Sequence, residues 1–239
     1  MIFDQHPHQV RCEWGERGLR ELTSTSDVVI ILDVLSFSTC VDIATANGAS
    51  VYPFKAIDAS AQTYADELGA TLATRDRNAG GYSLSPHSLV SIPPETRLVL
   101  PSPNGSTLSL ATGSRPTYAG CLRNAKAVAN AVQEHGPKIS VIPAGERWKD
   151  DRTLRPALED LLGAGAIIHY LRGDKSPEAL AAEITFLHFK GLLFDTLQSI
   201  GSGRELIEKR IVEDVQLASL LNCSLAAPCL NDGFYSANL

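Results

Sequence analysis

The sequence of 239 residues lacks the features that mark membrane-spanning and secreted proteins. No stretch approaches the roughly 20 apolar residues of a membrane span, and the longest apolar run, residues 28–32, is only strand-sized. Residues 1–8 contain no basic region followed by an apolar run, so we expect no signal peptide there. The five cysteines are odd in number and form no CxxC pair, which indicates reduced thiols and a cytoplasmic protein.

The charge balance argues against a nucleic-acid-binding protein, and the histidine spacing argues against a zinc protein. The net charge is −6 and Lys and Arg form no cluster, so a general nucleic-acid surface is not expected. The six histidines show no metal-ligand spacing apart from His6 and His8 near the start of the chain, which argues against a zinc site.

Several catalytic motifs are also absent. There is no P-loop, no GxGxxG, no HExxH and no GxSxG. No cysteine is followed six residues later by arginine, as a cysteine-dependent phosphatase loop would need. Asp33 is followed by Val34 and Leu35, so the DxD arrangement of aspartyl-phosphate phosphatases is missing.

What the sequence does contain is one local pattern that occurs four times. An apolar or β-prone run stops, a polar or glycine-bearing turn follows, and a helical pattern begins. The runs are 28–32, 98–100, 116–120 and 139–142. In an open parallel sheet such turns gather at the carboxyl edge, where helix N-termini bind anions. Because carboxylates at the same edge can hold a divalent cation, the pattern predicts phosphate chemistry with Mg²⁺.

Strand-like runs alternate with helical patterns as far as about residue 173. This alternation predicts an α/β fold with a largely parallel or mixed sheet flanked by helices. Residues 75–94 are rich in Gly, Ser and Pro and read as a long loop, of a kind that is often functional.

After residue 173 the pattern becomes helical, over 177–197 and again over 204–221. Residues 225–239 read as irregular, ending in a short strand or tail. We therefore expect a single domain over 1–239, in which residues 174–239 form a helical C-terminal cap packed on the sheet.

The segments after the strand-like runs resemble, in their joint order, the motifs of the 2-phosphosulfolactate phosphatase family. The matching segments are 29–39 with 46–49, 103–107, 122–129, 142–147 with 156–166, 202–204, 213–215 and 232–233. The resemblance implies a Mg²⁺-dependent enzyme that hydrolyses 2-phosphosulfolactate to sulfolactate and phosphate, on one route to coenzyme M. The chain departs from the family pattern at Ser36, where the family usually has arginine, and in 75–81, where a Glu-Arg-Gly-Gly segment is not intact.

Four carboxylates follow or border these turns and are the candidate Mg²⁺ ligands: Asp33, Glu146, Glu159 and Asp160. Asp33, Glu159 and Asp160 are also the candidate catalytic groups. Asp33 has the alternative role of a helix N-cap, and Glu146 that of a solvated loop residue. Because neighbours on a helix point about 100° apart, Glu159 and Asp160 cannot both point inward equally, so one is expected to bind Mg²⁺ and the other to support it.

The candidate substrate-binding residues are hydroxyls, amides and arginines near the same turns: Ser36, Ser38, Thr39, Asn104, Gly105, Ser106, Asn124, Arg147 and Arg204. The hydroxyls at 36–39 either donate to a phosphate or cap a helix. The turn at 104–106 lets the backbone approach a ligand closely, or is only a turn. Asn124 binds substrate or caps its helix. Arginine suits bidentate contacts with phosphate, and Arg75 and Arg77 in the long loop are further candidates to close over an anion.

The leading hypothesis is a Mg²⁺-dependent phosphatase whose partner is a small acidic phosphoester. One alternative is a non-catalytic binding protein for a phosphorylated metabolite. Another is a different phosphate-handling enzyme, such as a transferase or lyase, on the same scaffold. A homodimer is compatible with an enzyme of this size.

Overall fold

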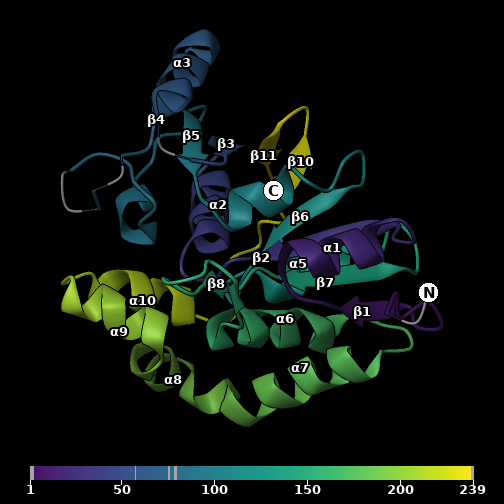
Figure 1. The fold of residues 1–239 in the computed structure, drawn as a ribbon. Helices are drawn as coiled ribbons and strands as arrows, with labels where there is room; N and C mark the ends of the chain where they lie inside the picture. The colour runs from purple at the N-terminus through teal and green to yellow at the C-terminus, as the bar shows by residue number, and fades with distance from the viewer. Residues whose placement is uncertain (1–2, 57, 75, 78–79, 238–239) are drawn as a thin grey trace.

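A computed structural model describes residues 3–56, 58–74, 76–77 and 80–237, and within them a nine-stranded sheet has helices on both faces (Figure 1). In spatial order the strands are β1 (Val10–Cys12), β7 (Ile139–Pro143), β2 (Val28–Leu32), β6 (Thr117–Gly120), β10 (Cys229–Asn231), β11 (Phe234–Ser236), β3 (Ser50–Phe54), β5 (Arg97–Pro101) and β4 (Thr71–Leu72). A separate hairpin pairs β8 (Glu146–Arg147) with β9 (Leu154–Arg155).

The large sheet consists of two parallel halves joined by an antiparallel hairpin. Strands β1, β7, β2 and β6 are parallel, as are β3, β5 and β4. The hairpin β10–β11 lies between the halves and runs antiparallel to β6 and β3. The predicted α/β fold with a largely parallel or mixed sheet is therefore confirmed. Residues 225–239, expected to be irregular with at most a terminal strand, instead contribute both middle strands.

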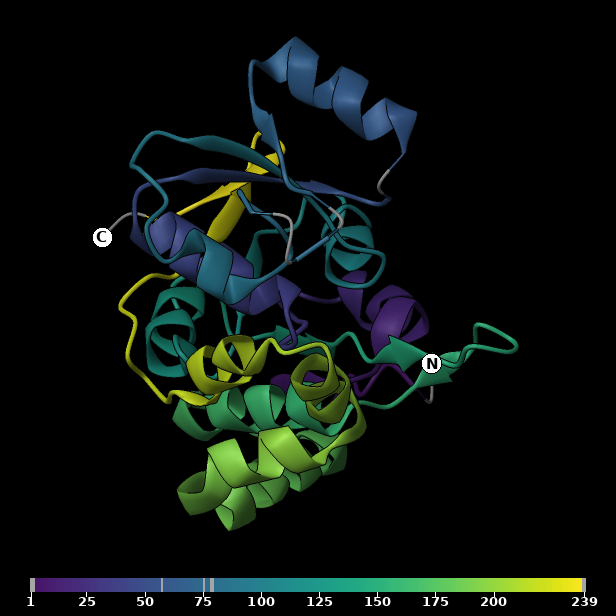
Figure 2. The same ribbon diagram turned by 90° about the vertical axis from the view of Figure 1, so that its left-hand side faces the viewer.

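The helices are α1 (Gly15–Thr23), α2 (Phe37–Ala46), α3 (Ala59–Leu68), α4 (Gly105–Ser109), α5 (Ala125–Val132), α6 (Leu158–Tyr170), α7 (Pro177–Phe189), α8 (Leu193–Ser199), α9 (Gly201–Glu208) and α10 (Val212–Ser219), with 3₁₀ turns η1 (Pro86–Leu89) and η2 (Lys190–Leu192). Helices α7 to α10 form the helical C-terminal region that the sequence predicted, and they gather on one side of the molecule with α6 (Figure 2). None of the described helices has the length and apolar character needed to cross a membrane.

The central strand β2 is buried on both faces because every residue in it is apolar. Val28, Ile30 and Leu32 belong to a cluster that includes side chains of α5 and α6. Val29 and Ile31 face the other way, into a cluster with α1 and α4. A strand buried on both faces is typical of a parallel sheet covered by helices, and it fixes the position of the turn that follows it.

Helix α6 is held firmly by α7. A Cβ atom at Gly165 would lie only 2.1 Å from the carbonyl oxygen of Ala182, so glycine permits the two helices to approach this closely. Phe186 and Ala182 of α7 are fully buried in the contact. The first turn of α6, which carries Glu159 and Asp160, is therefore anchored by packing along the rest of the helix.

Candidate active site

Asp33 lies directly after β2 and is the point at which two turns meet. Its Oδ2 accepts hydrogen bonds from the backbone N–H of Gly105 at 2.9 Å and from the hydroxyl of Ser102 at 3.2 Å. Its Oδ1 accepts one from the N–H of Phe37 at 3.3 Å, at the start of α2. A Cβ at position 105 would lie 2.3 Å from the Phe37 ring, so this turn requires glycine.

Asp160 connects the turn after β2 to the turn after β7. Its Oδ1 accepts the N–H of Val34 at 2.7 Å, and its Oδ2 accepts the N–H of Gly145 at 2.8 Å. The neighbouring Glu159 is equally buried but interacts with the hydroxyl of Ser202 instead. The two adjacent carboxylates thus point to different partners, as their separation of about 100° around the helix predicts.

The four candidate carboxylates converge into one electrostatic cluster. Burial raises the pKa of Asp33, Glu146, Glu159 and Asp160, and charges within the cluster raise these pKa values further. Glu159 acts on Asp33 and Asp160, Glu146 acts on Glu159, and Asp33 acts on Glu146. Such a concentration of buried acids is costly unless protons or a cation neutralise them.

The carboxylate oxygens of the cluster differ in the hydrogen bonds that they already accept. Those of Asp33 and Asp160 accept hydrogen bonds from turns that follow different strands, whereas Glu146 is bonded by the Asn104 amide at 3.2 Å and by its own neighbour, the N–H of Arg147. Among the residues described, no three His, Cys, Asp or Glu side chains form a ready-made metal site. Glu146 and Glu159 nevertheless suit Mg²⁺, which proteins often hold through one or two carboxylates together with substrate oxygens and water.

A cavity of about 210 Å³ opens beside Glu146. Asn104 and Arg147, two of the predicted substrate-binding residues, line it. Residues 15–17 at the start of α1, to which the sequence pattern gave no role, also line it. Arg147 is held there by an ion pair between its Nη2 and Oε1 of Glu16 at 2.7 Å.

Several predicted hydroxyls are buried and shape the turns. Ser38 Oγ accepts the N–H of Asp33 at 3.1 Å, and Thr39 donates to the carbonyl of Val34 at 2.8 Å. Ser106 donates to the carbonyl of Leu100 at 3.0 Å. These side chains keep the turns after β2 and β5 in shape around Asp33.

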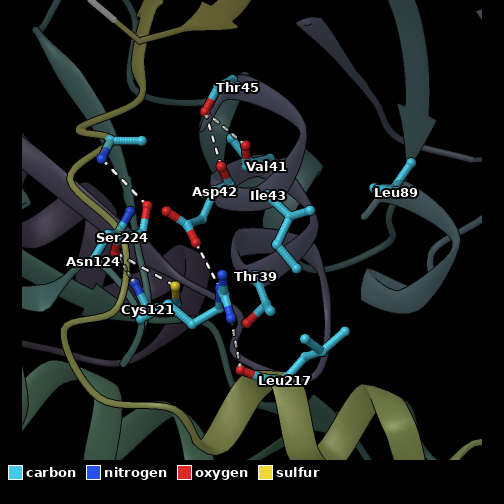
Figure 3. A network of polar contacts seen from close by, with 12 residues as sticks. Thr39, Val41, Asp42, Ile43, Thr45, Leu89, Cys121, Asn124, Leu217 and Ser224 are labelled. Atoms are coloured by element: carbon cyan, nitrogen blue, oxygen red, sulfur yellow. Dashed lines mark hydrogen bonds and ion pairs between the residues drawn. The ribbon is translucent and has the colours of Figure 1, made fainter. Parts of the chain in front are cut away.

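Asn124 and Arg204, two further predicted substrate-binding residues, lie away from the cavity beside Glu146. Asn124 is fully buried beside Cys121 (Figure 3); its Oδ1 accepts the N–H of Cys121, and its Nδ2 donates to the carbonyl of Ala119 in β6. Arg204 is exposed on α9 and lines a separate hollow with Lys149. Neither residue lines the cavity beside Glu146.

The same region contains a buried ion pair that joins α2 to the C-terminal helices (Figure 3). Arg123 Nε lies 2.8 Å from Oδ2 of Asp42, and Arg123 Nη1 donates to the carbonyl of Leu217 at 3.2 Å. Burial raises the pKa of Asp42, while the Ser224 hydroxyl and the Arg123 charge oppose that shift. This contact secures α10 against the helix that follows the Asp33 turn.

Arg155 is a candidate site residue that the sequence pattern did not single out. It lies opposite Glu146 in the β8–β9 hairpin, and its Nη2 donates to Ser202 Oγ at 3.3 Å. Its positive charge lowers the pKa values of Glu146 and Glu159, against the larger effect of burial. The sequence signal was only a charged run over 146–155, and the antiparallel register of the hairpin is what places Arg155 beside the acids.

Arg77 is brought to the same turn from the long loop. Its Nη1 lies 3.0 Å from Oγ of Ser36, the position where the family pattern usually has arginine, and 3.1 Å from Oδ2 of Asp214. The other candidate arginine of this loop, Arg75, lies outside the described residues.

The chain is similar to known proteins over most of its length. A family model described as 2-phosphosulpholactate phosphatase matches residues 17–233. A protein of Carboxydothermus hydrogenoformans named probable 2-phosphosulfolactate phosphatase is 29% identical over 206 residues, covering 81% of this chain and 82% of that protein. The 2-phosphosulfolactate phosphatase of Methanothermobacter thermautotrophicus is 28% identical over 214 residues, covering 87% and 88%.

Proposed function

Since the chain belongs to the 2-phosphosulfolactate phosphatase family, we propose that it hydrolyses 2-phosphosulfolactate, or a closely related 2-phospho acid, to the hydroxy acid and phosphate in a Mg²⁺-dependent reaction. The observation that carries this proposal is the convergence of three buried carboxylates, Asp33, Glu159 and Asp160, with the half-buried Glu146, which lines a cavity at the strand ends. We place the enzyme in the cytoplasm, on a route to coenzyme M.

The acidic cluster by itself would repel a phosphate dianion. Glu146 and Glu159 are the residues that would hold a Mg²⁺ ion; when bound, the ion neutralises charge and polarises the phosphoryl oxygens. Arg155, already beside both glutamates, is placed to bind phosphate oxygens through its planar guanidinium. Asn104 orients Glu146 through its amide.

Asp33 and Asp160 act on the turns that surround the reacting group. Asp33 accepts three donors from two turns, and Asp160 ties the turn after β2 to the turn after β7. Preorganised turns need no rearrangement during the reaction, so backbone N–H groups and arginines can stabilise the developing charge.

The test is phosphate release from a panel of small phosphoesters, with Mg²⁺ and with a chelator. We expect release from 2-phosphosulfolactate or phospholactate that the chelator abolishes and that Glu159→Gln strongly reduces. Glu178→Gln, on the exposed face of α7, is the matched control and should behave as the wild type. Release that persists in chelator would refute the Mg²⁺ dependence. Binding of the esters without any release would favour the non-catalytic alternative.

A further inference from the structure

Arg77 in the long loop is mostly buried and contacts two side chains. Its side chain is 19% exposed, and its ion-pair partner Asp214 is completely buried. Both of its hydrogen bonds, to Ser36 and Asp214, are made by Nη1. As far as the described part of the chain shows, the Nη2 edge of the guanidinium is left for another acceptor.

Asp214 anchors the arginine by joining three elements. Besides Arg77, it accepts the hydroxyl of Ser85 at 2.6 Å and the N–H of His87 at 3.0 Å, while it projects from the first turn of α10. A buried carboxylate is favourable only when donors and a countercharge surround it. The network therefore fixes the guanidinium between the long loop, η1 and α10.

The anchored charge lies at the turn that carries Asp33. Ser36, which Arg77 contacts, is three positions after Asp33. Burial raises the pKa of the Cys40 thiol, one turn into α2; the nearby charge of Arg77 lowers it, and those of Asp214 and Asp33 raise it further. Arg77 thus approaches the first turn of α2 from the loop, whereas Arg155 reaches the acidic cluster from the β8–β9 hairpin.

We propose that Arg77 is a specificity-determining residue that binds the acidic group of the substrate that is not transferred, an oxyanion such as a carboxylate or sulfonate. This inference rests on the proposed phosphatase function. A 2-phospho acid carries a second anion close to its phosphate, and that anion needs a cation of its own. The planar fork of a guanidinium matches two oxygens of such a group. Arg155 and Arg77 then bind opposite ends of one small substrate.

The experiment compares wild type with Arg77→Met on three esters. Two, 2-phosphosulfolactate and phospholactate, carry a second acid, and isopropyl phosphate keeps a secondary phosphoester without one. We expect the ratio of kcat/KM for 2-phosphosulfolactate to that for isopropyl phosphate to fall about ten- to a hundredfold, mainly through KM, as expected for loss of a charge-assisted contact. Arg77→Lys should recover part of this ratio. A larger loss for 2-phosphosulfolactate than for phospholactate identifies the sulfonate as the bound group, and equal losses identify the carboxylate.

Two controls separate this role from folding and from the proposed function. Arg97→Met removes an exposed arginine at the start of β5 and should leave the ratio unchanged. An equal loss on all three esters, or no loss, would overturn the assignment of Arg77. Calorimetric binding of sulfolactate and lactate, which needs no turnover, should weaken about tenfold or more in Arg77→Met for at least one of them. If wild type releases no phosphate but this difference persists, only the phosphatase proposal fails; if both acids bind equally well to both proteins, the Arg77 assignment fails.

Discussion

The backbone N–H of Gly105 donates to Oδ2 of Asp33 over 2.9 Å, although the two residues are 72 positions apart in the chain. Asp33 follows β2, in one parallel half of the sheet, and Gly105 follows β5, in the other half. The site carboxylate is therefore also a bridge between the halves. Changes at this bridge should affect activity and stability together.

Gly105→Ala tests this bridge directly. The added Cβ would lie 2.3 Å from the Phe37 ring and 2.9 Å from Asp33 Oδ2, so the turn must shift. We expect the free energy of unfolding to fall by about 1–3 kcal/mol, the usual range for overpacking, with a parallel loss of phosphate release. Urea denaturation and the release assay measure the two effects. Gly191→Ala, where nothing lies within 4 Å, is the control and should be nearly neutral. If Gly105→Ala and Gly191→Ala changed stability and phosphate release equally, the contact between Gly105 and Asp33 would not connect the two halves as proposed.

We expect the main effect of Asp160→Asn to be a loss of stability. The amide has one acceptor oxygen, so either Val34 or Gly145 loses the partner of its N–H. We expect the free energy of unfolding to decrease by about 1–3 kcal/mol, the cost of an unsatisfied buried donor. Glu159→Gln leaves those two N–H bonds intact, so chemical denaturation should show no comparable loss for it. A larger loss of stability in Glu159→Gln than in Asp160→Asn would mean that the hydrogen bonds of Asp160 do not stabilise the two turns.

The acidic cluster predicts a pH-dependent stability. Burial raises the pKa of Glu159 above its ordinary value of 4.5, so the folded chain binds this proton more tightly than the unfolded chain. The contribution of Glu159 to stability is therefore present below pH 4.5 and is lost as the pH rises through the raised pKa. Without Mg²⁺, the melting temperature of Glu159→Gln should exceed that of wild type by a margin that grows with pH. Added Mg²⁺ should narrow the margin at high pH, because a bound cation favours the charged carboxylate. If the difference in melting temperature between Glu159→Gln and wild type depended on neither pH nor Mg²⁺, the raised pKa of Glu159 would not explain the pH dependence of stability.

Arg155→Met should lower kcat/KM for every phosphoester by a similar factor. The residue lies beside Glu146 and Glu159, where the phosphate is proposed to bind. Loss of one donor to a developing negative charge costs about a hundred- to a thousandfold in rate. The same three esters used for Arg77 provide the measurement. Loss confined to the acidic esters would assign Arg155 to the acidic end of the substrate instead.

Much of the fold could be predicted because its main signals are local. The unbroken apolar run of β2 and the turns after it predict buried parallel strands flanked by helices. The short strands β1, β10 and β11, each three residues long, carry no such signal. They are strands because Val10 lies opposite Ile139 and Tyr235 opposite Val51, pairings that only the assembled sheet provides.

Only the approximate position of the candidate site could be predicted. The rule that the carboxyl ends of parallel strands meet at one edge places the turn with Asp33 near the start of α6, which carries Asp160. Which atoms those carboxylates contact depends on the approach of two turns within hydrogen-bonding distance, and no residue pattern reports that. The anchoring of Arg77 depends on Asp214, 137 positions away, and on the packing of α10. Long-range side-chain contacts of this kind appear only in the folded chain.

The hairpin β10–β11 also has a consequence for the order of folding during synthesis. Strands β1 to β7 lie within residues 10–143 and leave the ribosome first, followed by α6 to α10. Until residues 229–236 follow, β6 and β3 have unpaired edges facing the gap between the half-sheets. Open strand edges are templates for pairing with other chains, so the nascent protein passes through an interval of exposure to aggregation that ends only when its last strands fill the gap.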